Sequence, residues 1–174
     1  MPEHRPPLRV LHLEDDPHDA ELVAARLRAD GLVCEIVRVD TRPLFEAALT
    51  SGPWDVILAD DRLPSFDGAG ALALARDLRP EVPFLFVSGT LGEEVAVERL
   101  KAGATDYVLK HRLSRLGSAI TRALAEGQVR SERAAAEGEV RRLNADLEQR
   151  VATRTAELER ANRALAEREG ALRT

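Results

Sequence analysis

The sequence has 174 residues, of which 44% are hydrophobic and 32% are charged, and its formal net charge is -5. A chain of this length can bury one core of ordinary size and not two. Residues 1–118 carry 14 basic and 20 acidic side chains, and residues 119–174 carry 11 and 10. Neither segment has the basic excess of a typical nucleic-acid-binding protein, so we expect no nucleic-acid partner.

Cysteine content and hydropathy indicate a cellular location. Cys34 is the only cysteine, so no intrachain disulfide can form, and a reducing compartment is indicated. No apolar run approaches the roughly 20 residues that a membrane helix needs, and the polar start of the chain is unlike a signal peptide. We therefore expect a cytoplasmic protein without a membrane partner.

Two hydrophobic patterns alternate along the first part of the chain. Short apolar or β-branched runs predict five strands, at residues 9–14, 32–39, 54–59, 83–87 and 105–109. Segments with helical spacing predict helices between the strands, at residues 18–29, from Thr41 to Gly52, at 69–79 and at 93–102. Strands that alternate with helices form a mostly parallel sheet covered on both faces, so the predicted fold class is α/β and doubly wound.

Polar side chains stand where four of these strands end. Glu14 and Asp15 end the first strand, Asp60 the third, Ser88 the fourth and Lys110 the fifth. Ligands of open parallel sheets bind beyond the carboxyl ends of the strands. Any one of these residues alone is best interpreted as a solvated loop residue, but their coincidence at one edge predicts a site.

The residue types at this edge fit phosphoryl chemistry. Clustered carboxylates are costly unless something neutralises them, and oxygen-only sites suit Mg²⁺, which often binds a phosphate as well. A metal there would polarise an incoming phosphoryl group, and an aspartate such as Asp60 can act as the nucleophile and form an acyl phosphate. The Ser88 hydroxyl and the Lys110 ammonium can then hold the phosphoryl oxygens.

Four segments of the chain resemble the response-regulator receiver family, over residues 8 to about 118. They are LHLEDDPHDAEL, WDVILADDRLPSFDG, LFVSGT and AGATDYVLK, and they match in order and spacing. The resemblance implies that residues 1–118 form a receiver domain with a flavodoxin-like sheet of strand order 2-1-3-4-5. It also implies phosphorylation by a sensor histidine kinase or a phosphotransfer protein.

The same resemblance gives the site residues their roles by position. Asp60 corresponds to the phospho-acceptor, Ser88 to the switch hydroxyl, Tyr107 to the switch aromatic and Lys110 to the phosphate-contacting lysine. The Mg²⁺ ligands that it implies are Glu14, Asp15, Asp60 and the backbone carbonyl of Arg62. A regulatory phospho-acceptor is expected, with at most self-catalysed phosphorylation and dephosphorylation, rather than an enzyme.

Asp61 is the rival acceptor because it directly follows Asp60. The family proline lies four residues after the acceptor, and Pro64 stands four residues after Asp60. Successive residues of an extended chain point to opposite sides, so Asp61 is expected to face away from the Asp60 site.

Two positions depart from the family pattern. His111 stands where a proline usually follows the lysine, so we expect the loop to hold Lys110 in a different way. The segment after Ser88 is the flexible Gly89–Gly92, which resembles the variant in receivers linked to sensor kinases.

Residues 119–174 predict a helix continuous with the last receiver helix. Its apolar positions have heptad spacing, with one stutter of four residues from Leu147 to Val151. The acid-to-arginine pairs expected at i,i+4 are Glu126/Arg130, Glu137/Arg141, Asp146/Arg150, Glu159/Arg163 and Glu169/Arg173. A helix with one apolar seam and no partner in its own chain favours a homodimer through this segment.

The tail segment LNADLEQRVATRTAELERANRALAERE resembles signalling coiled coils that precede histidine-kinase or cyclase output domains. We therefore expect phosphorylation to change the face made by the fourth helix, the fifth strand and the fifth helix. The coiled-coil dimer would then signal to an output domain absent from this chain. The alternative is a constitutive structural dimer with a vestigial receiver.

Two other classes of function fit the sequence less well. A phosphatase with an aspartyl nucleophile usually needs a second acid two residues later, where this chain has Arg62. A flavin-binding module of the same topology needs a hydroxyl- and glycine-rich loop after the first strand. This chain has the acidic segment Glu14–Pro17 there, which would repel a phosphate.

Overall fold

The computed structural model describes residues 6–64, 66–89 and 93–171. Strands and helices alternate along the chain, as the sequence predicts. The strands are β1 (Leu8–Leu13), β2 (Cys34–Val39), β3 (Val56–Ala59), β4 (Phe84–Ser88) and β5 (Asp106–Leu109). The helices are α1 (Pro17–Ala29), α2 (Arg42–Ser51), α3 (Gly68–Leu78), α4 (Glu93–Lys101), the 3₁₀ helix η1 (Lys110–Arg115) and α5 (Leu116–Ala171).

The five strands form one parallel sheet in the order β2-β1-β3-β4-β5, which confirms the predicted fold class and strand order. The register places Leu13 of β1 opposite Ala59 of β3, and Ser88 of β4 opposite Leu109 of β5. The residues that follow these strands therefore meet at one edge of the sheet.

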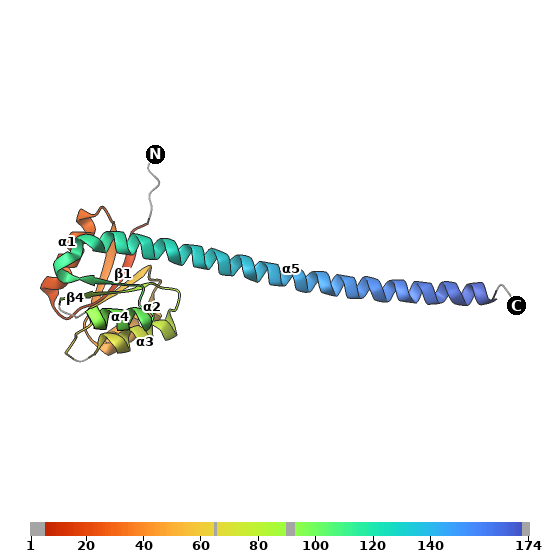
Figure 1. Cartoon of the computed structure of the whole chain (residues 1–174), viewed down its shortest axis with the longest axis horizontal. Coiled ribbons are helices and arrows are strands. Elements are labelled where there is room, and N and C mark those ends of the chain that lie inside the picture. The colour runs from red at the N-terminus through yellow and green to blue at the C-terminus, as the bar shows by residue number, and fades with distance from the viewer. Residues whose placement is uncertain (1–5, 65, 90–92, 172–174) are drawn as a thin grey trace. The chain divides into compact units, whose positions relative to one another are not determined.

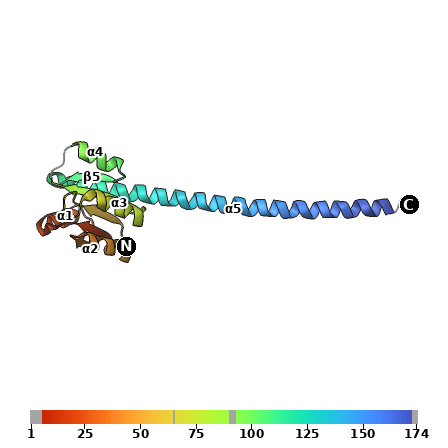
Figure 2. The same ribbon diagram turned by 90° about the horizontal axis from the view of Figure 1, so that it is seen from below.

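Helices cover both faces of this sheet (Figures 1 and 2). On one face, side chains such as Leu11 and Phe86 pack with residues of α2 and α3 and with Ala96 of α4. On the other face, side chains such as Val10 and Leu58 pack with α1 and with the first turns of α5. Both faces are apolar at β1, β3, β4 and β5, which the helices cover, whereas the edge strand β2 is partly exposed.

Local capping signals fix where the helices beside the predicted site begin. The carboxylate of Asp16 accepts a hydrogen bond of 2.8 Å from the backbone N–H of His18, and Pro17 occupies the first turn of α1. The carboxylate of Asp67 accepts one of 2.6 Å from Gly70 at the start of α3. The Asp16 cap therefore confines Glu14 and Asp15 to the short loop between β1 and α1.

A short turn separates β5 from the last helix. Residues Lys110–Arg115 form a 3₁₀ turn, and α5 begins at Leu116 and runs without interruption through the predicted tail helix to Ala171. Arg112 has φ -128° and ψ 37° within this turn, so the chain is kinked there before the long helix starts.

Helix α5 has 56 residues, and the chain divides into two compact units, Met1–Val129 and Arg130–Thr174. In the first unit, Leu116 and Ile120 of α5 are buried in the core. The second unit is helical through Ala171. No helix in the described ranges is both long and apolar enough to cross a membrane.

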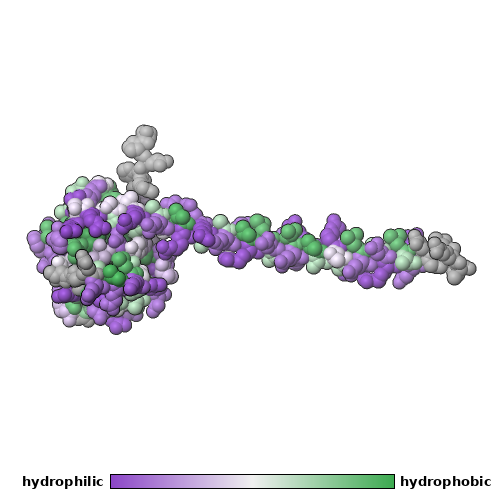
Figure 3. Space-filling model, in the orientation of Figure 1, coloured by the Kyte–Doolittle hydropathy of each residue, from purple (hydrophilic) through white to green (hydrophobic). Residues whose placement is uncertain are grey.

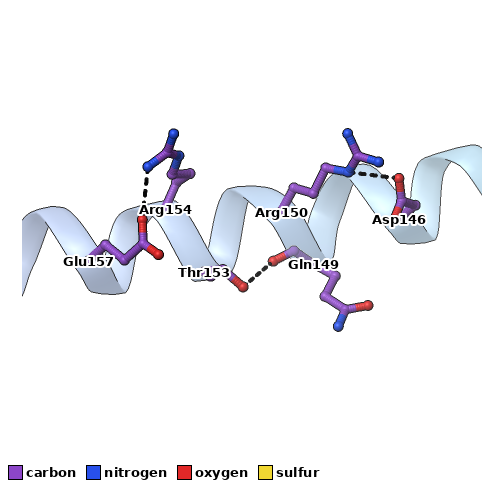
Figure 4. A pocket seen from close by; sticks show the side chains of 6 residues that line it. All are labelled: Asp146, Gln149, Arg150, Thr153, Arg154 and Glu157. Carbon is purple, nitrogen blue, oxygen red and sulfur yellow. Dashed lines mark hydrogen bonds and ion pairs between the residues drawn. The ribbon is translucent and has the colours of Figure 1, made fainter.

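Ion pairs along the polar surface of α5 only partly follow the prediction. Asp146 pairs with Arg150 at 2.9 Å, as predicted, and Arg154 pairs with Glu157 at 3.0 Å (Figure 4). In the described part of the helix, Glu137 pairs with the preceding Arg133 rather than with Arg141, and Glu126 with Arg122 rather than with Arg130. Arg173 lies outside the described residues, so the pair Glu169/Arg173 stays a prediction.

Candidate functional site

Three carboxylates meet at the carboxyl ends of β1 and β3. Glu14 follows β1, Asp60 follows β3, and both are buried, whereas Asp15 is exposed. One oxygen from each of the three lies within 4.8 Å of the others. The neighbouring strands β1 and β3 therefore bring together the acids that the sequence places at their ends.

Lys110 supplies the positive charge of this site. It directly follows β5, and its Nζ lies 2.7 Å from Asp60 Oδ2 and 2.7 Å from Glu14 Oε2. The same Nζ donates a hydrogen bond of 2.6 Å to Oδ2 of Asp19 in α1. The first two partners were predicted at this edge from the sequence, whereas Asp19 was not, because it lies on a helix, 91 residues before the lysine.

Burial and charge act in opposite directions on these groups. Burial opposes the charge of Lys110, but hydrogen bonds to Asp19, Asp60 and Glu14 outweigh it, so the pKa of Lys110 is raised. Burial raises the pKa of Glu14, and the hydrogen bond from Lys110 opposes that rise. The site therefore holds a charged ammonium among carboxyl groups, and one of these, Glu14, ionises less readily than an ordinary glutamate.

Asp60 is oriented by two donors, one on each carboxylate oxygen. Its Oδ2 accepts the hydrogen bond of 2.7 Å from Lys110, and its Oδ1 accepts one of 3.3 Å from the backbone N–H of Arg62. Arg62 in turn forms an isolated antiparallel bridge with Asp67, the residue that caps α3. These two interactions connect the loop after β3 to Asp60, the candidate acceptor.

Ser88 and Tyr107 lie on the two strands beyond β3. Ser88 is the last residue of β4 and is buried, and Tyr107 lies in β5 opposite Phe86, with ring centroids 6.1 Å apart. Burial raises the pKa of Tyr107, whose buried hydroxyl has no hydrogen-bond partner among the described residues. The two predicted switch residues therefore lie on adjacent strands, two register positions apart.

The family model described as the response regulator receiver domain matches residues 10–121. This chain belongs to the receiver family. The transcriptional regulatory protein ZraR of Salmonella typhimurium is 32% identical over 117 residues, which are 67% of this chain and 26% of ZraR. The cell cycle response regulator CtrA of Brucella ovis is 30% identical over 129 residues, which are 70% of this chain and 53% of CtrA. The receiver thus spans only part of each of these relatives.

Solved receiver domains share the fold. The receiver domain of a sensor histidine kinase from Pseudomonas aeruginosa, with a magnesium ion in its active-site cleft, has a TM-score of 0.60 and 24% identity. It covers 68% of this chain and 98% of its own. A CheY-like receiver domain protein of Methanospirillum hungatei has a TM-score of 0.63 and 26% identity. The match covers 71% of this chain and 98% of that protein's chain. These likenesses place the receiver architecture over the first unit and leave most of α5 unmatched.

The residues of this receiver fit a bound Mg²⁺. The donor set of Glu14, Asp15 and Asp60 is made only of carboxylate oxygens, which are the ligands that this ion prefers. Two of these acids are buried, and buried carboxylates need a cation nearby. In this structure that cation is Lys110, so the site has the charge and the ligand type that a divalent ion requires.

The side chain of the rival acceptor Asp61 forms an ion pair with Arg99. Its Oδ1 accepts a hydrogen bond of 2.6 Å from Nε of Arg99 in α4, and its side chain is 5% exposed. The guanidinium of Arg99 also lies 5.9 Å from the ring centroid of Phe86. This confirms that Asp61 points away from the Lys110 side of the receiver, toward α4.

His12 lies within β1, beneath the acidic edge of the receiver, and is fully buried. Among the described residues, neither of its ring nitrogens has a hydrogen-bond partner. Burial, and then the charge of Lys110, lowers the pKa of His12 to about 4. This is the environment of a ring packed within the sheet.

Proposed function

We propose that Asp60 accepts a phosphoryl group from the phosphohistidine of a sensor histidine kinase or a phosphotransfer protein, in a Mg²⁺-dependent step. The observation that carries this proposal is the meeting of Glu14, Asp15 and Asp60 within 4.8 Å, with Lys110 Nζ 2.7 Å from Asp60. The chain then acts as a regulatory switch in the cytoplasm and not as an enzyme with a separate substrate.

The chemistry follows from the groups around Asp60. A carboxylate oxygen of Asp60 attacks phosphorus, the phosphorus–nitrogen bond of the donor breaks, and the donor imidazole leaves and takes a proton from water. Asp60 becomes an acyl phosphate, and Lys110 and the Ser88 hydroxyl donate hydrogen bonds to its oxygens. A bound Mg²⁺ would neutralise charge on the transferring group, and its proposed ligands are Glu14, Asp15, Asp60 and the carbonyl of Arg62.

A switch through Ser88 and Tyr107 is the proposed consequence of phosphorylation. Ser88 is the residue of β4 at the site edge, and Tyr107 lies on the adjacent strand β5, two register positions away. When Ser88 turns toward the phosphoryl oxygens, it leaves space beside β5, and the ring of Tyr107 repacks. The surface made by α4, β5 and the start of α5 changes as a result.

A dimer through α5 is the proposed output, because the helix carries a stripe of exposed apolar side chains. The stripe residues, each 53–64% exposed, are Val140, Leu143, Leu147, Val151, Leu158 and Leu165. At about 100° per residue they fall within a sector of about 80°. Figure 3 shows apolar patches that recur along this helix. A second copy of the chain is the simplest partner for such a stripe, and an output domain would follow it.

Phosphorylation with a small-molecule donor tests the acceptor. The full chain is incubated with acetyl phosphate with and without Mg²⁺, and intact mass is measured for wild type, Asp60→Asn and Asp61→Asn. One added phosphoryl group is expected in wild type and in Asp61→Asn, only with Mg²⁺, and none in Asp60→Asn. Asn at position 61 keeps an oxygen for Arg99, so it is a matched control. Phosphorylation of Asp60→Asn contradicts the proposal.

Light scattering separates the switch from the constitutive alternative. Mass and radius in solution are measured with and without beryllofluoride and Mg²⁺, for wild type and Asp60→Asn. A dimer that forms or changes shape only in wild type supports a phospho-switch. A dimer that is the same in all four samples supports the constitutive structural dimer instead, for which the exposed stripe alone is sufficient.

A further inference from the structure

Asp19 is the acid of this site that lies outside the carboxylate set proposed for the metal. The set that meets within 4.8 Å, as far as the described residues show, is Glu14, Asp15 and Asp60. Asp19 instead stands in the first turn of α1, and its Oδ2 is 2.6 Å from Lys110 Nζ. Its contact with the acceptor site therefore runs through the lysine.

We propose that Asp19 is a positioning residue that holds the Lys110 ammonium beside Asp60 for phosphoryl transfer. This inference rests on the proposed function and adds to it a residue that the receiver resemblance did not supply. The Lys110 ammonium forms ion pairs of 2.6–2.7 Å with Asp19, Asp60 and Glu14. Two of its three N–H donors form charge-assisted hydrogen bonds, to Asp19 and to Asp60.

The three partners of Lys110 differ in what phosphorylation requires of them. Metal ligation draws on oxygens of Glu14 and Asp60, and the phosphoryl group is added to Asp60 itself. Both contacts of the lysine must therefore loosen when the site is loaded. Asp19 takes part in neither event, so its contact is the one that can keep the ammonium in place while the other two donors turn to the phosphoryl oxygens.

The elements that carry this contact are suited to positioning. Lys110 begins the kinked turn η1, and a lysine stem has many rotamers, so its backbone alone does not fix the ammonium. Asp19 stands in the first turn of a helix whose start is fixed by the Asp16 cap. The side chains of Lys110 and Asp19 are 15% and 30% exposed, so water competes only partly for the pair.

Nitrogen NMR tests the contact in the metal-free protein. The sequence contains two lysines, Lys110 and the exposed Lys101, so labelling with ¹⁵N-lysine gives two ammonium signals, one of which is an internal control. An Nζ signal of Lys110 with slow proton exchange is expected in the full-length wild type, and faster exchange in Asp19→Ala, with Lys101 unchanged. The same exchange rate for Lys110 in both proteins overturns the inference.

Phosphorylation kinetics test the consequence as a double-mutant cycle. With acetyl phosphate and saturating Mg²⁺, Asp19→Ala is expected to slow phosphorylation about tenfold. A rate loss of this size corresponds to the loss of one charge-assisted hydrogen bond in the transition state. Asp19→Asn keeps an acceptor oxygen and should recover part of the rate, while Glu21→Ala, at an exposed acid on the same helix, should not change it. In a Lys110→Ala background, Asp19→Ala should have no further effect.

The outcomes separate this inference from the proposed function. A wild-type rate in Asp19→Ala, or an equal loss with and without Lys110, overturns the positioning role and leaves Asp60 as the acceptor. Failure of the wild type to be phosphorylated, or phosphorylation of Asp60→Asn, overturns the proposed function, and the NMR result for the metal-free protein is unaffected by it.

Discussion

His12 predicts that the receiver loses stability in mildly acidic solution. The ring is fully buried, and burial followed by the charge of Lys110 lowers its pKa to about 4 from an ordinary value of 6.5. The folded protein therefore resists protonation of His12, whereas the unfolded chain accepts a proton near pH 6.5. Stability should fall as the pH drops below about 6.5, and the loss should be complete below about pH 4.

The size of the effect follows from the gap between the two pKa values. A gap of about 2.5 pH units corresponds to about 3 kcal/mol of unfolding free energy, at about 1.4 kcal/mol per unit. Between pH 7 and pH 5 the expected loss from His12 is about 2 kcal/mol. Domains are stable by about 5–15 kcal/mol in total, so this loss is easily measured.

Other charges also respond to pH, so the assay compares variants. Glu14 acts in the opposite sense, because its raised pKa lets the folded state take up a proton before the unfolded state does. Urea unfolding is measured at pH 7 and pH 5 for wild type, His12→Leu and the control His18→Leu, which alters an exposed histidine. Wild type and His18→Leu should lose about 2 kcal/mol more than His12→Leu over this range. Equal losses in all three proteins would refute the reasoning.

Two further predictions concern an ion pair of the first unit and the apolar stripe of the second. Arg99→Gln should lower the unfolding free energy by about 3 kcal/mol in urea unfolding, because it leaves Asp61 buried without its cation. Adding Asp61→Asn should recover part of that loss, and additive losses would contradict the pairing. Leu158→Glu should give a monomer in light scattering, whereas Gln149→Glu, about 180° away around the helix, should leave the dimer intact.

Much of the fold and of the acidic site could be predicted from the sequence. Buried parallel strands leave a simple pattern of apolar runs, and the residue that ends each run must lie at the sheet edge. For that reason Glu14, Asp60 and Lys110 could be placed together although they are far apart in the chain. The register of neighbouring strands then fixes the positions of these three residues along the strand direction to within about one residue.

The partners supplied by helices could not be predicted in the same way. Asp19 in the first turn of α1 and Arg99 in the last turn of α4 both have an ordinary local explanation, as charges that complement the helix dipole. Only the packing of each helix on the sheet shows that Asp19 reaches Lys110 and that Arg99 reaches Asp61. Helical periodicity fixes a face but not how far along the sheet that face lies.

Asp60 and Asp61 are adjacent in the chain, yet each has a cation of its own on a different side of the sheet. Their α-carbons are only about 3.8 Å apart, so the two ion pairs share one peptide unit. Negative charge added at Asp60 without a compensating cation raises the electrostatic energy of the Asp61 carboxylate, and Arg99 offsets that repulsion. The charge at Asp60 is in this way coupled to the cation that Asp61 holds on α4.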